Sequence, residues 1–313
     1  MPTINSVLGP LDTANLGFTL MHEHLLVTSA GIPQNYPELL RAGFMDRLPN
    51  FMDRIVTALT EAKAEGIDTI VDTTTLNLGR DVTILAEASR LTGVNIIACS
   101  GWYVDMPHYL ARVSADQFAQ VFIREIQEGI ASTAIKAGIL KEASDTEGVT
   151  AGGATILRAV ARAHRQTNVP IMLHSYSPGQ VGRQQLAILK EEGVDLNRVK
   201  VDHSNDTTDV EYLTWLLEQG CYLGMDRYPG LNTSPRARTR TMKTLIDAGY
   251  AHRLLPSHDW PVVFVTEEVP RERRNPFLYI KKVVFAQLRE MGVPEATLNS
   301  LCVDNPRNFF EGA

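Results

Sequence analysis

The chain has 313 residues, which suits one α/β barrel of about 250 residues with additions. Hydrophobic residues make up 44% of it and charged residues 21%, a balance typical of a globular protein with a large core. The net charge of −6 argues against nucleic acid or an anionic membrane surface as a partner, and no apolar run approaches the roughly 18–20 residues that a bilayer requires.

The composition also bears on compartment and domain count. The first five residues lack the charged and apolar regions of a signal peptide. The three cysteines, Cys99, Cys221 and Cys302, provide no disulfide framework, so we expect reduced thiols in a cytoplasmic protein. The sequence contains no internal repeat, low-complexity tract or linker, and we expect a single domain over residues 1–313.

Short β-branched and apolar runs alternate along the chain with segments of helical periodicity. The candidate strands, in chain order, cover residues 17–22, 68–73, 95–100, 137–141, 170–174, 199–203, 221–226 and 253–257. Apolar residues with a period of 3.6 fill the intervals, for example over residues 51–59, 118–126 and 155–160. A strand–helix unit repeated about eight times predicts a parallel sheet closed into a (β/α)8 TIM barrel, with an open doubly wound sheet as the alternative.

The first candidate strand ends in His22-Glu23-His24. Side chains two residues apart on a strand point the same way, so His22 and His24 project together. Two converging imidazoles are a common basis of a metal site, although two structural histidines give the same pattern. Glu23 points the other way, into the barrel wall or a neighbouring element, and is left out of the catalytic set.

The later candidate strands also end in chemically active side chains. These are Lys141, His174, His203, Arg227 and Asp259. The C-terminal ends of barrel strands carry the active site, so these groups meet at one rim, where four imidazoles and an acid predict a metal centre. His258 also ends a strand, and the remaining histidines are interpreted as surface or packing residues: His108, His164 and His252.

The donor set exceeds what one tetrahedral ion needs, which favours two metal ions. Two dications need a bridging anion, and an ammonium beside them would be repelled. Lys141 would therefore be carboxylated by CO2 to a carbamate that bridges the ions together with a hydroxide. The alternative is an ordinary lysine that binds substrate or forms a salt bridge. Zinc is the favoured metal, and iron, cobalt or manganese accept the same ligands.

Six motifs taken together resemble the phosphotriesterase family of the amidohydrolase superfamily, and within it the phosphotriesterase-like lactonases. They are GFTLMHEH (17–24), IKAGILK (135–141), HSNDTTD (203–209), GMDRY (224–228), SHDW (257–260) and VDNPRNFF (303–310). The resemblance covers essentially the whole chain. It implies a binuclear centre at the end of a barrel and a homodimer.

The resemblance assigns roles to the ligands. It implies that the more buried metal is held by His22, His24 and Asp259, and the more exposed one by His174 and His203. Carboxylated Lys141 and a hydroxide would bridge the two ions. That hydroxide would attack a lactone carbonyl or a phosphoryl centre, and Asp259 would take up the proton with help from Asp206.

Two further positions match the lactonases. The resemblance implies that Tyr103 contacts the lactone near the exposed metal, with Trp102 as the neighbouring alternative. Arg227 matches the arginine that ends the seventh strand in lactonases and could pair with Asp206. A structural salt bridge at the barrel rim is the other role for Arg227, and both can hold.

The resemblance favours a lactonase with promiscuous organophosphate hydrolysis, acting on a small-molecule lactone or organophosphate ester. A dedicated phosphotriesterase (aryldialkylphosphatase) is the first alternative, and a non-catalytic ligand-binding relative is another. A sugar-lactone hydrolase is also considered, because the loop after the eighth strand carries Arg271, Arg273 and Arg274. This basic cluster could meet a carboxylate or phosphate, or could form a solvated turn.

Overall fold

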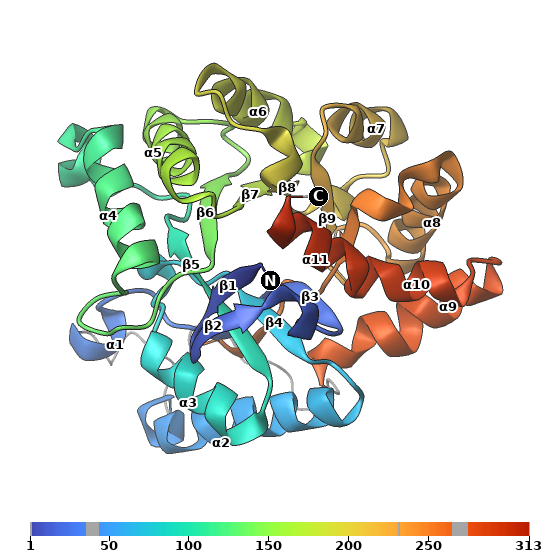
Figure 1. Cartoon of the computed structure of the whole chain (residues 1–313), viewed down its shortest axis with the longest axis horizontal. Coiled ribbons are helices and arrows are strands. Elements are labelled where there is room, and N and C mark those ends of the chain that lie inside the picture. The colour runs from blue at the N-terminus through green and yellow to red at the C-terminus, as the bar shows by residue number, and fades with distance from the viewer. Residues whose placement is uncertain (1, 36–43, 231, 265–274, 313) are drawn as a thin grey trace.

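The computed structural model describes residues 2–35, 44–230, 232–264 and 275–312, which form a ring of helices around a curled parallel sheet (Figure 1). The strands of this sheet are β3 (Thr19–Val27), β4 (Thr69–Asp72), β5 (Asn95–Gly101), β6 (Ile139–Ser144), β7 (Ile171–Ser175), β8 (Val199–Val201), β9 (Tyr222–Met225), β10 (Leu254–Pro256) and β11 (Pro261–Phe264). They follow one another in the order β10-β9-β8-β7-β6-β5-β4-β3-β11. Arg271, Arg273 and Arg274 lie outside the described residues.

Helices cover the outside of the sheet. They are α1 (Ile32–Asn35), α2 (Phe44–Ala64), α3 (Val82–Thr92), α4 (Ala115–Gln127), α5 (Ala151–Thr167), α6 (Gly182–Glu191), α7 (Val210–Glu218), α8 (Pro235–Leu245), α9 (Phe285–Glu290), α10 (Glu295–Cys302) and α11 (Asp304–Glu311). Within the described ranges, no helix combines the length and apolar character needed to cross a membrane.

The sheet closes through an interrupted last strand. β10 pairs with β9 at one end of the strand order, and β11 pairs with β3 at the other. Between them, the His22 N–H donates to Ser257 Oγ at 3.0 Å and the Asp259 N–H donates to His22 O at 3.0 Å. The chain from β10 to β11 therefore runs along β3, and the predicted (β/α)8 barrel is confirmed.

Three predicted strand ends are wrong by two residues or more. The predicted ends are residue 22 for the first strand, 141 for the fourth and 203 for the sixth, but β3 continues to Val27, β6 continues to Ser144 and β8 ends at Val201. The apolar run Leu25-Leu26-Val27 extends β3, and β11 pairs with this extension. His22, His24 and Lys141 therefore lie inside strands.

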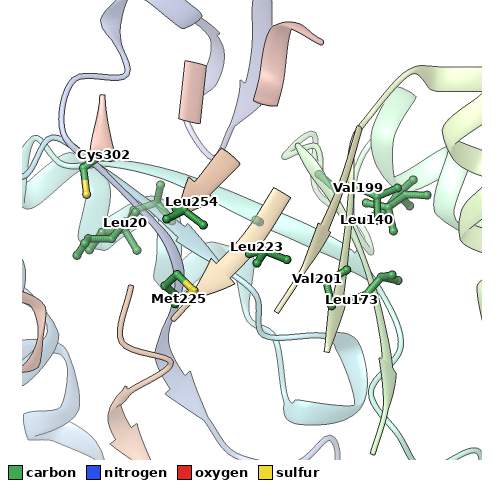
Figure 2. Packing of buried hydrophobic residues seen from close by; sticks show 14 of the residues in the cluster. Leu20, Leu140, Leu173, Val199, Val201, Leu223, Met225, Leu254 and Cys302 are labelled. Carbon is green, nitrogen blue, oxygen red and sulfur yellow. The ribbon is translucent and has the colours of Figure 1, made fainter. Parts of the chain in front are cut away.

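The strands alternate between two hydrophobic clusters. One fills the barrel interior with side chains from several strands: Met21, Val71, Ile97, Cys99, Ile139, Met172, Tyr222 and Leu255. The other lies between sheet and helices, and Figure 2 shows part of it, with Leu140, Leu173 and Val201 projecting from successive strands. This alternation is the two-residue period of a strand.

One end of the barrel is closed by the chain termini. Leu16 and the α11 residues Phe309 and Phe310 join the interior cluster. The hairpin of β1 (Thr3–Ser6) and β2 (Gly9–Asp12) lies over the middle of the ring together with α11, and both termini lie there (Figure 1). On β6 the inward-facing Ile139 is followed two residues later by Lys141, and on β7 Met172 is followed by His174. Polar side chains therefore collect at the opposite, C-terminal end of the barrel.

Candidate metal centre

Four imidazoles and one carboxylate meet at the C-terminal end of the barrel. The Nε2 atoms of His22 and His24 each lie 3.2 Å from Asp259 Oδ1. His174 Nδ1 and His203 Nε2 lie 2.7 Å apart. Ligand atoms of His22, His203 and Asp259 all fall within 4.8 Å of one another. The sequence prediction that these five residues share one site agrees with their placement.

The second nitrogen of each ring is engaged by a neighbouring group. His22 Nδ1 and His203 Nδ1 lie 3.2 and 3.0 Å from oxygens of Asp226, and His174 Nε2 lies 3.2 Å from Asp145 Oδ2. Because a carboxylate only accepts hydrogen bonds, Asp145 and Asp226 favour the protons of the neutral His174 and His203 rings on these outer nitrogens. The facing nitrogens of these two rings are then left with lone pairs, which is the state that a metal requires.

His174 and His203 are the most informative pair. Burial, above all, lowers the pKa of both rings, that of His203 well below its usual value, so both are neutral near pH 7. Their protons already point at Asp145 and Asp226. With the protons on those sides, two lone pairs face each other 2.7 Å apart, and a cation bound by both nitrogens would remove their repulsion. The donor set therefore fits a bound metal ion.

His22 is surrounded by negative charge. Burial and Lys141 lower the pKa of its ring, but Asp202, Asp259 and Asp226 outweigh them and raise it to about 10. Its Nδ1 lies 3.2 Å from both Asp202 and Asp226. Three carboxylates around one imidazole create a potential that favours a cation at this position.

Below the imidazoles lies a fully buried cluster of lysines and aspartates. Lys141 is paired with Asp202, and Lys200 lies 2.6 Å from Asp202 Oδ1 and 2.8 Å from Asp226 Oδ2. These ion pairs hold the pKa of Lys200 above its usual value, despite its burial. A Cβ on Gly224 would lie 2.2 Å from Asp226 Oδ2, so glycine at that position makes room for the carboxylate. The unmodified Lys141 thus forms a salt bridge, which is what the alternative to a carbamate, an ordinary lysine, predicts.

Asp259 connects the imidazoles to a chain of charged groups. Arg227 Nε donates to Asp259 Oδ2 at 2.9 Å, and Arg227 Nη1 donates to Asp206 Oδ2 at 2.6 Å. Although burial opposes it, the two carboxylates raise the pKa of Arg227. Asp259 itself adopts a positive φ of 52° at the break between β10 and β11. The predicted contact between Arg227 and Asp206 is present.

Tyr103, rather than Trp102, faces the imidazoles. The Tyr103 ring packs edge-on against His174 with centroids 5.2 Å apart, and Asn77 holds its backbone through two hydrogen bonds. Burial, followed by the nearby carboxylates, raises the pKa of its phenol to about 12, so it stays protonated. The Trp102 ring packs on Phe118 instead.

Glu23 points away from the site, as predicted. Its Oε1 accepts hydrogen bonds from Ser257 Oγ and from Nδ1 of His258, while His258 Nε2 accepts from the Ile280 N–H. Both nitrogens of His258 are therefore used in joining β3, the end of β10 and the segment before α9. This histidine is structural.

Sequence reasoning missed Asp145, Lys200 and Asp202. Lys200 and Asp202 repeat the i, i+2 spacing of His22 and His24, with apolar Val199 and Val201 facing outward, so the same alternation could have identified them. Asp145 follows β6 and contacts His174 only through the tertiary fold. No local pattern marks it.

Comparisons with known proteins agree with this geometry. The sequence model of the phosphotriesterase family matches residues 2–310. A phosphotriesterase homology protein of Mycobacterium tuberculosis is 41% identical, with 99% of this chain and 98% of that protein covered. An aryldialkylphosphatase of Saccharolobus solfataricus is 33% identical, with 96% of each covered. The solved structure of the phosphotriesterase from M. tuberculosis superposes with a TM-score of 0.91 at 38% identity, covering 99% of this chain and 98% of that one.

Proposed function

The chain belongs to the phosphotriesterase family and is a hydrolase, and we propose that it is a binuclear metal-dependent lactonase with weaker phosphotriester hydrolysis. The observation that carries the metal requirement is the pair of buried rings, His174 and His203, whose facing nitrogens lie 2.7 Å apart while their other nitrogens lie against Asp145 and Asp226. Tyr103 and Arg227, the two residues that resemble the lactonases, both border this centre and support the lactone assignment.

The proposed ligands divide into two groups and a bridge. His22, His24 and Asp259 would hold one ion, His174 and His203 the other, and Lys141 would bridge them as a carbamate. Carboxylation joins the Lys141 nitrogen to the carbon of CO2 and releases one proton, which converts a cation into an anion. When bound, the two ions would supply a Lewis acid for the substrate oxygen and an activated water as nucleophile. Zinc is the proposed metal.

The protein's own groups would position the substrate and move the proton. Asp259 would accept the proton released as water attacks, because its carboxylate lies among the converging nitrogens. Arg227 orients that carboxylate through its Nε–H, and Asp206 anchors Arg227 on its far side. The protonated Tyr103 phenol would donate a hydrogen bond to the lactone.

Phosphotriester hydrolysis is proposed as the second activity because the Saccharolobus relative is named an aryldialkylphosphatase. The sugar-lactone alternative depended on Arg271, Arg273 and Arg274, which lie outside the described residues. A homodimer, a cytoplasmic location and a single domain over residues 1–313 complete the proposal.

Steady-state kinetics of the metal-analysed protein test this proposal. We expect about two equivalents of metal per chain. Activity should be lost after chelation and recovered on adding zinc. In a series of lactones of different acyl-chain length, the best substrate should have a higher kcat/KM than paraoxon-like triesters. A triester preference would favour the dedicated phosphotriesterase. A metal-loaded protein that hydrolyses no lactone or ester would overturn the enzyme assignment.

A further inference from the structure

A buried arginine that lies on a helix, not at a strand end, contacts the connected charged side chains of Asp259, Arg227 and Asp206. Arg238 lies in α8 and is fully buried. Its Nη1 lies 2.6 Å from Asp206 Oδ1 and donates to Asn205 O at 2.7 Å, and its Nε donates to Thr233 O at 2.9 Å. These partners belong to the loops after β8 and β9. Arg238 therefore joins both loops to the carboxylate that anchors Arg227.

The chain makes a specific place for this guanidinium. A Cβ on Gly230 would lie 2.4 Å from Arg238 Nη2, and Gly230 has a φ of +72° that suits glycine. Asn205 contacts both arginine residues, because its backbone carbonyl accepts from the Arg238 guanidinium and its side-chain oxygen accepts from the backbone N–H of Arg227. Both guanidinium groups lie 2.6 Å from the carboxylate of Asp206, the next residue, so the two arginines meet at the same short segment.

Together these contacts form an alternating series of charges: Arg238, Asp206, Arg227 and Asp259. We propose that Arg238 is a positioning residue of the hydrolytic site, which forms an ion pair with Asp206 Oδ1 and thereby keeps Arg227 shared between Asp206 and Asp259. This inference rests on the proposed function, because Asp259 is the proposed proton acceptor. It assigns Arg238 no contact with substrate.

The physical reason lies in the geometry of guanidinium–carboxylate pairs. A carboxylate and an arginine prefer two parallel hydrogen bonds. Arg238 attracts Oδ1 of Asp206 as an ion pair, a contact without hydrogen-bond geometry, so Arg227 donates to Oδ2 alone and its Nε–H remains directed at Asp259. Without Arg238, both oxygens of Asp206 would attract Arg227, whose side chain is 32% exposed and has room to move.

A purely structural role for Arg238 would predict different results, and a matched control separates the two. Arg198 is also buried and also donates to two backbone carbonyls, Phe310 O at 2.8 Å and Asn168 O at 2.6 Å. It lies against α11 at the other end of the barrel. Arg198→Met therefore removes a comparable buried arginine without touching the charged series.

The experiment compares Arg238→Met, Arg238→Lys, Asp206→Asn, the double variant Arg238→Met/Asp206→Asn, and Arg198→Met in the zinc-loaded protein. We expect Arg238→Met to lower kcat by about 10- to 100-fold, the range typical of residues that orient the ligands of a metal site, with KM nearly unchanged. The double variant should be no slower than Asp206→Asn, and Arg238→Lys should recover part of kcat. Arg198→Met should lose thermal stability but keep kcat.

A crystal structure of zinc-loaded Arg238→Met provides a readout that does not depend on turnover. We expect Arg227 to have left Asp259 and to bind both oxygens of Asp206. Additive losses in the double variant, an equal loss of kcat in Arg198→Met, or an unmoved Arg227 would each overturn the inference. If the wild-type protein hydrolyses none of the tested substrates, the proposed function fails, whereas the position of Arg227 still decides the role of Arg238.

Discussion

Asp226 offers the sharpest test of how the buried charges support the site. Its Oδ1 accepts from the His203 backbone N–H at 2.7 Å and from His203 Nδ1 at 3.0 Å. Its Oδ2 accepts from Lys200 at 2.8 Å and lies 3.2 Å from His22 Nδ1. Asp226→Asn keeps the shape of this side chain but replaces one accepting oxygen with a donating NH2 group. Whichever oxygen is replaced, the new NH2 group faces either the two His203 donors or Lys200 and His22, and cannot accept their hydrogen bonds.

The size of the effect follows from what is lost. Breaking one partner of a buried ion pair destabilises a protein by about 3–5 kcal/mol, so we expect a loss of this order in the free energy of unfolding. Misorienting His22 or His203 should weaken zinc binding by about 10- to 100-fold, or about 1.4–2.7 kcal/mol. Competition with a chromophoric chelator measures the affinity, and urea unfolding of the metal-free protein measures the stability.

Glu142→Gln is the matched control. Glu142 is also a buried strand carboxylate, but it accepts from Ser144 and Gln185 on the helix side of β6. We expect it to leave zinc affinity unchanged. The reasoning would be refuted if Asp226→Asn lost stability but bound zinc as tightly as the wild type, because Asp226 would then only neutralise Lys200.

Lys141→Ala should lose nearly all activity, and short carboxylic acids added with zinc should restore part of it by replacing the carbamate; no rescue would contradict the carbamate. Asp259→Asn should abolish turnover even when metal-replete, as measured by single-turnover kinetics. Tyr103→Phe should lower kcat/KM for lactones more than for triesters, which a paired substrate assay checks. Burial raises the pKa of Glu142 to about 7, so its stabilisation is present below about pH 4.5 and is lost as pH rises through about 7. In thermal melts, the melting temperature of Glu142→Gln should rise relative to that of the wild type as the pH increases over that range.

The strand–helix alternation and the residues near the strand ends were accessible from the sequence because both are local properties. A two-residue period shows which side chains share a face, and the barrel rule states where such faces meet. This was sufficient to group His22 with His203 and Asp259. It was not sufficient for the strand bounds, since pairing with β11 extends β3 beyond the predicted end.

The tertiary structure alone decided which groups hold the ligands in place. The break between β10 and β11 brings Asp259 to His22, Asp145 reaches His174 from another strand end, and Arg238 reaches Asp206 from a helix. Sequence spacing cannot predict such contacts, because they join segments whose separation along the chain carries no information about distance. The sequence by itself therefore determined the barrel and its set of candidate ligands. The closed sheet decided their protonation, orientation and charge balance, because these depend on which buried groups face one another.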